Sequence, residues 1–118
     1  MKYRSDFVTN SSSSSFLVSR RDDCTEQDVR DALYKLEPAI IEYFRSYSYE
    51  PDEEDVGELF DQLVAEIYDT PGEDRQGHWE TFISEYTNQG EGPMSGFIYE
   101  QYPALQSSVF KVQRLERI

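Results

Sequence analysis

Between residues 51 and 69, apolar side chains recur at the spacing that marks one face of an α-helix. They are Val56, Leu59, Phe60, Leu63, Val64 and Ile67. Side chains three and four residues apart lie on the same side of a helix, so this side must be buried in a folded chain. We expect the helix to begin at Pro51, which suits the first helical position, and to end at Thr70-Pro71-Gly72.

The same segment carries most of the charge. Residues 46–74 contain eleven acids and no lysine or arginine, and the net charge of the whole chain is -13. Charge gathered in one region creates a directional field and favours a basic partner. Ten of these acids form the candidate partner-binding surface: Asp52, Glu53, Glu54, Asp55, Glu58, Asp61, Glu66, Asp69, Glu73 and Asp74.

Two further elements are expected before this segment. Residues 16–18 are apolar and flanked by serine and arginine, which indicates a short strand. Thr25 is a good N-cap, and the apolar stripe that follows keeps its phase across Pro38, which predicts one kinked helix rather than two. The stripe comprises Val29, Leu33, Leu36, Ile40, Phe44 and Tyr47.

Three elements are expected after it. A shorter third helix should carry Trp79, Phe82, Ile83 and Tyr86 on one side, and residues 97–102 and 109–115 favour strands. The pattern predicts an α+β fold in a single domain spanning residues 1–118. About three helices would pack on a small antiparallel sheet formed by the N-terminal and two C-terminal strands.

The sequence gives little support to several function classes. Cys24 is the only cysteine, so no intrachain disulfide can form, and no apolar run approaches the length of a membrane helix. We therefore expect a cytoplasmic protein without membrane contact. Acidic neighbours should raise the thiol pKa of Cys24, and the single histidine, His78, has no recognisable catalytic partner. We expect no metal, no cofactor and no direct binding of nucleic acid, which the negative charge opposes.

The first residues resemble a known opening. Met1-Lys2-Tyr3-Arg4-Ser5-Asp6-Phe7-Val8-Thr9-Asn10, five serines and Phe16 are similar to the start of many small, mostly uncharacterised bacterial and phage proteins. The resemblance implies a bacterial or mobile-element source and no particular activity. Residues 1–15 are either flexible or a turn-rich lead-in whose Phe7 and Val8 pack against the core.

These observations leave several hypotheses open. The first is a non-enzymatic interaction protein whose acidic helix imitates nucleic acid, for example a phage or mobile-element inhibitor of a basic, nucleic-acid-handling host protein. The second is a small regulatory or immunity-type protein that binds through an aromatic groove, with the acids serving solubility only. Tyr43, Tyr47, Tyr49 and Tyr68 bracket the acidic segment and could anchor a partner. The third, an enzyme, requires a cleft where two titratable groups meet. The oligomeric state is open.

Overall fold

The computed structural model describes residues 13–87 and 92–115. Of the N-terminal segment 1–15, residues 1–12 lie outside the described part, whereas residues 13–15 begin a strand, so the expectation of a flexible or turn-rich segment is wrong for these three. The elements are β1 (Ser13–Arg21), α1 (Glu26–Tyr34), α2 (Glu37–Ser46), α3 (Glu53–Val64), a π-helical turn η2 (Ala65–Asp69), β2 (Asp74–Gln76), β3 (Trp79–Thr87), α4 (Pro93–Gln101), a 3-10 turn η3 (Tyr102–Ala104) and β4 (Phe110–Arg114). The predicted α+β class is confirmed.

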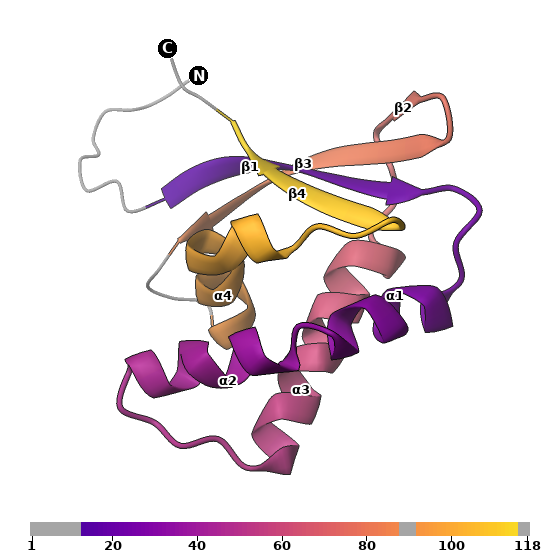
Figure 1. Ribbon diagram of the computed structural model, residues 1–118. Helices are drawn as coiled ribbons and strands as arrows, with labels where there is room; N and C mark the ends of the chain where they lie inside the picture. The colour runs from indigo at the N-terminus through magenta and orange to yellow at the C-terminus, as the bar shows by residue number, and fades with distance from the viewer. Residues whose placement is uncertain (1–12, 88–91, 116–118) are drawn as a thin grey trace.

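The strands form one antiparallel sheet in the order β2-β3-β1-β4. β1 is central, and its Val18 stands opposite Phe82 of β3 on one side and Val112 of β4 on the other. The helices all lie on one side of this sheet, as Figure 1 shows. An antiparallel sheet is therefore confirmed, and so is the strand expected within residues 109–115. The sheet differs from the prediction in its strands, because β2 and β3 belong to it and residues 97–102 do not.

The core lies between the sheet and the helices. Phe16 and Val18 of the central strand are fully buried, because alternate residues of β1 face the helical layer. The helices contribute Val29, Leu33, Ile40, Leu59, Leu63, Ile67, Phe97 and Ile98, each no more than 2% exposed.

α1 and α2 are separate helices, so the prediction of one kinked helix is wrong. Pro38 lies in the first turn of α2, where its missing N–H leaves no helical bond unmade. The chain turns just before it, and the N–H of Leu36 donates to the carbonyl of Leu33 at 2.8 Å. The break rotates the buried face, so that Tyr43 is 7% exposed whereas Tyr47 is 53% exposed.

Helices α1 and α3 both begin with a capping box. Thr25 caps α1 as predicted, and its side chain accepts the N–H of Asp28 at 3.1 Å. Helix α3 begins at Glu53 with Asp52 as its N-cap, so the start predicted at Pro51 is wrong. The predicted buried face of this helix is confirmed, since Val56, Leu59, Phe60, Leu63, Val64 and Ile67 are all buried.

Residues 79–87 form strand β3, so the predicted third helix is wrong. Phe82 and Tyr86 fit the alternation of a strand as well as the spacing of a helix, and both are buried. Ile83 lies on the opposite face and is 57% exposed. Threonine, isoleucine and aromatic residues favour strands, and β3 pairs with the central strand over its whole length.

Residues 93–101 form helix α4, so the strand predicted at residues 97–102 is wrong. α4 contacts β3, α2 and α3, and Figure 1 shows it between the sheet and these helices. Gly96 allows this close approach, because a Cβ atom there would overlap the hydroxyl of Tyr43 on α2. The surrounding elements thus override the strand preference of the aromatic residues in this segment.

A buried arginine connects the sheet to the end of the long helix formed by α3 and η2. Nη1 of Arg20 donates to the carbonyls of Ile67, Tyr68 and Thr70, each at 2.9 Å, and Nη2 donates to Glu80 at 2.5 Å. Carbonyls at the C-terminal end of a helix lack intrahelical partners, so a cation there satisfies them and interacts favourably with the helix dipole.

Glu80 is shared between two arginines. Its second oxygen accepts a bond from Arg75 at 2.8 Å. Arg75, Glu80 and Arg20 stand opposite one another in a single row across β2, β3 and β1. The network therefore joins three strands and the end of the helix in one place.

The Arg20→Met substitution should lower the free energy of unfolding by about 3–5 kcal/mol, because it leaves buried carbonyls and Glu80 without their cation. The matched control is Arg21→Met at the next position, where the guanidinium pairs with Asp23 at the surface. The control should change stability by less than about 1 kcal/mol. Urea unfolding measures both, and equal effects would contradict the assigned role of Arg20.

Replacing either of two helical glycines by alanine should change the stability of the protein, in opposite directions at the two positions. Gly57 in α3 has no atom within 4 Å of an added Cβ, so Gly57→Ala should stabilise the protein by up to about 1 kcal/mol through helix propensity. Gly96→Ala should destabilise it by about 1–3 kcal/mol, because the methyl group meets Tyr43 in a packed region. Thermal or urea unfolding of the two variants tests this packing.

Candidate functional site

The connection between α2 and α3 is held by local bonds. At the end of α2, Ser48 adopts a left-handed conformation with φ of 60°. The N–H groups of Ser48 and Tyr49 donate to the carbonyls of Arg45 at 2.9 Å and Phe44 at 3.2 Å, which is the Schellman arrangement. The rings of Tyr49 and Phe44 lie 5.8 Å apart, and Glu50 accepts two bonds from Arg45 at 3.0 and 2.9 Å.

The first turn of α3 is fixed in the same way. Asp52 accepts the N–H of Asp55 at 2.9 Å, and Asp55 accepts the N–H of Asp52 at 3.1 Å and the hydroxyl of Tyr49 at 2.9 Å. These bonds lower the pKa of Asp55, chiefly through the backbone of Asp52. Carboxylates at this end of a helix are also favoured by its dipole. The first turn of α3 is therefore rigid, and it holds its acidic residues in fixed positions.

Besides the exposed N-cap Asp52, three acids in the first two turns of α3 face solvent, and we call them the α3 acidic face: Glu53, Glu54 and Glu58. Glu54 and Glu58 lie one turn apart on the side of the helix away from the core. Within the described residues, none of the three forms an ion pair. Their charge is therefore available to a partner.

Asp61 extends this side of the helix but has a partner within the fold. Its carboxylate accepts a bond from Arg30 of α1 at 3.1 Å, and Arg30 also bonds Glu26 at 3.1 Å. The pair joins α1 to α3, so Asp61 serves the packing of the two helices.

Glu66 faces the sheet and does not belong with the exposed acids. It accepts bonds from the hydroxyl of Tyr86 and, at 3.4 Å, from Ser84 on β3. Burial, followed by the bond to Glu66, raises the pKa of Tyr86 strongly. Glu66 therefore connects the end of the long helix to β3.

The last three predicted acids lie beyond the other end of the helix. Asp69 ends η2, about 25 Å from Glu53 along the helix axis. Glu73 and Asp74 are exposed, and Asp74 accepts the N–H of Arg75 at 2.8 Å. The structure thus does not gather the ten predicted acids on one surface.

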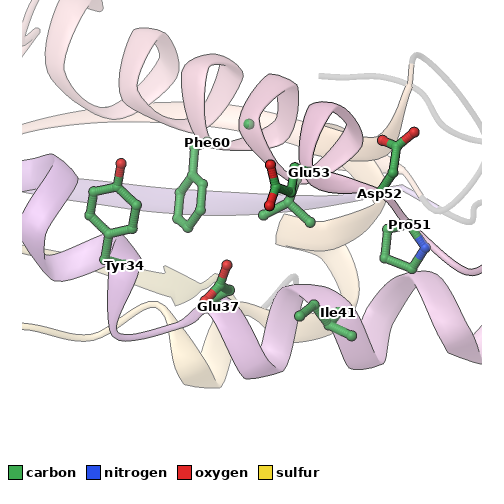
Figure 2. A pocket seen from close by; sticks show the side chains of 9 residues that line it. Tyr34, Glu37, Ile41, Pro51, Asp52, Glu53 and Phe60 are labelled. Atoms are coloured by element: carbon green, nitrogen blue, oxygen red, sulfur yellow. The ribbon is translucent and has the colours of Figure 1, made fainter.

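A groove lies beside the α3 acidic face. It has a volume of about 430 Å³ and lies between α3 on one side and the end of α1 and the start of α2 on the other (Figure 2). Its apolar lining consists of Tyr34, Ile41, Pro51, Val56 and Phe60. Glu37, Asp52 and Glu53 supply its polar groups, and Gly57 completes it. No lysine, arginine or histidine is among these lining residues.

One end of the groove is closed by aromatic rings. The rings of Tyr34 and Phe60 lie 4.9 Å apart. Arg30, one turn before Tyr34 on α1, pairs with Asp61, the residue after Phe60 on α3, across the same junction. Figure 2 shows Glu37 on α2 and Glu53 on α3, on opposite sides of the open space.

The tyrosines that bracket the acidic segment have different roles. Tyr43 packs in the core, and Tyr68 is half-buried. Tyr47 and Tyr49 are 53% and 50% exposed, but their hydroxyls donate to Glu100 and Asp55. The bond to Glu100 raises the pKa of Tyr47 to about 12.

The open face of the sheet carries a separate group of side chains. Trp79 lies there between Arg21 and Lys111, whose charged groups are 5.7 and 4.6 Å from the ring centre. Both distances are within the range of cation–π contacts, so the two bases stabilise the half-buried tryptophan.

The residues considered for catalysis lie apart from the groove. His78 is exposed in the turn before β3, with Nδ1 3.5 Å from Asp22, and does not begin a helix. Burial raises the pKa of Cys24 and acidic neighbours add to this, so the expected direction is confirmed with a different main cause. In residues 13–87 and 92–115, no cluster of three or more histidine, cysteine or acidic side chains is arranged to hold a metal ion.

An aromatic groove was one of the hypotheses from the sequence, but its position and its lining residues were not predicted. Its lining comes from three helices, and the patterns of single helices do not show which side chains meet between them. Gly57 was the one available signal, because a glycine inside a helix is unfavourable unless its missing side chain has a use.

Comparison with protein-family models finds no match, and comparison with curated proteins and solved structures finds no significant similarity. Among the described residues, every helix is too short or too polar to cross a membrane.

Tyr86, which is buried and bonded to Glu66, should make stability depend on alkaline pH. In the unfolded chain a tyrosine ionises near pH 10, whereas folded Tyr86 keeps its proton to higher pH. The free energy of unfolding should therefore fall as pH rises above about 10, by up to about 1.4 kcal/mol per pH unit from this group. Tyr86→Phe should reduce that slope in urea unfolding, and an unchanged slope would contradict the raised pKa of Tyr86.

Proposed function

We propose that the protein is a non-enzymatic binding protein whose α3 acidic face engages a basic surface of a partner protein. One observation carries the proposal. Glu53, Glu54 and Glu58 are exposed and have no ion-pair partner among the described residues, on a helix whose first turn is fixed by hydrogen bonds. An acidic surface used for solubility alone does not require a helix start that is fixed by so many hydrogen bonds.

Surfaces that handle nucleic acid are a natural target for this face. They are built to accept regularly spaced negative charge, and carboxylates one helical turn apart present such a pattern. An inhibitor of a nucleic-acid-handling protein, encoded by a phage or mobile element, is the concrete form of the proposal. The N-terminal resemblance supports that source.

A second candidate function follows from the groove. The exposed ring of Tyr34, the buried Phe60 and the half-buried Ile41 offer an apolar surface that could receive a partner while the acids only keep the protein soluble. Under this alternative, charge reversal on α3 leaves binding unchanged.

The test uses the double variant Glu54→Lys/Glu58→Lys. Asp61 is left intact, because a lysine there would oppose Arg30 and disturb the packing of α1 on α3. Partners are captured on the wild-type chain from a bacterial lysate, identified by mass spectrometry and purified for affinity measurements. We expect the double variant to bind its partner at least about tenfold more weakly, since like charges across an interface cost several kcal/mol. Wild-type binding should weaken with salt.

The matched control is Asp31→Lys/Glu42→Lys, which changes the charge equally at exposed positions on α1 and α2. Binding should survive in this control. Double-stranded DNA should also compete with the wild-type chain for the partner. Equal affinity of wild type and the α3 double variant, or simultaneous binding of DNA at the same affinity, would refute the proposal.

A further inference from the structure

The groove has walls that suit a flat, partly apolar group. Tyr34 is 57% exposed and its ring meets Phe60 at one end of the groove. Val56 and Ile41 line the space between α3 and α2. A volume of about 430 Å³ lies at the small end of ligand sites in proteins, which suits one long side chain with its neighbouring backbone.

The charge of the groove selects a cation. Glu37 and Glu53 stand on opposite sides of it, and neither carboxylate forms a hydrogen bond or an ion pair within the described residues. Asp52 adds a third carboxylate at the open end. Because no base is among the described residues that line the groove, a positively charged occupant would find partners there and a negative one would be repelled.

Gly57 keeps the space open. It lies in the second turn of α3 and lines the groove, and an added Cβ would meet no atom within 4 Å. No steric constraint of the fold therefore requires glycine at this position. A larger side chain would instead project into the space that an occupant needs.

We propose that this groove receives an arginine side chain from the basic partner, an inference that rests on the proposed function. A guanidinium group is planar and can stack on the exposed ring of Tyr34. Its N–H groups point outward in a fork, so they can reach the carboxylates of Glu37 and Glu53. Lysine carries a compact ammonium group and would satisfy only part of this arrangement.

The probe is a short peptide in which arginine alternates with glycine, compared with the matching lysine and norleucine peptides. Titration of the isotope-labelled full chain, followed by NMR, gives each affinity and the amides that respond. The arginine peptide should bind several-fold more tightly than the lysine peptide and shift the amides of Glu37, Glu53 and Gly57. Glu37→Gln/Glu53→Gln should weaken it.

The decisive variant is Gly57→Leu, which fills the groove without changing any charge. It should weaken the arginine peptide and the natural partner by at least about tenfold. Gln62→Leu makes a comparable change at an exposed position of the same helix outside the groove, and should leave both affinities unchanged. Circular dichroism checks folding, and Tyr34→Ala replaces Gly57→Leu if that variant does not fold.

The outcomes separate this inference from the proposed function. Unchanged affinity in Gly57→Leu, or tighter binding of the norleucine peptide than the arginine peptide, overturns the arginine site. The proposed function still stands if Glu54→Lys/Glu58→Lys then weakens the natural partner. If neither set of variants changes partner binding, both proposals fail.

Discussion

The contacts of the buried Arg20 guanidinium set the position of the long helix. β1 is held between two neighbouring strands, so the position of Arg20 is fixed. From there Arg20 bonds carbonyls of η2 and of Thr70 just after it. With that end anchored at the sheet, the other end of α3 projects away from it (Figure 1). The acidic face and the groove both lie at this projecting end. Their place in the molecule therefore depends on one cation that touches neither of them.

Sequence reasoning predicted an element correctly where its apolar residues fit only one spacing, either that of a helix or that of a strand. The apolar residues of α3 fit helical spacing over three turns and do not alternate, so the predicted buried face is right. The segments around Phe82 and Phe97 are short and rich in aromatic residues, and each fits two periods. Contacts with distant parts of the chain decide between them. β3 pairs with β1, and Gly96 of α4 packs against Tyr43.

The sequence shows the acidic residues, but it does not show which of them have partners within the fold. Asp61 and Glu66 carry the same charge as Glu54 and Glu58, and they differ only because Arg30 and Tyr86 lie within reach. Counting the charged residues of a segment cannot identify such partners, since each partner lies on a different helix or strand from its acid. The acids of the α3 acidic face, which have no ion-pair partner among the described residues, form a smaller set at the start of that helix.

The central position of β1 has a consequence for how the chain folds. β1 is the first described element along the chain, yet its partners β3 and β4 are the third and last of the four described strands, and helices α1 to α3 lie between β1 and β3 in the sequence. The sheet and the bonds of Arg20 to Glu80 therefore form only after most of the chain has left the ribosome. Contacts so distant in sequence slow folding, because a long loop must close before they stabilise anything. During that interval the strand with the most buried sheet positions would have both of its edges open to other chains.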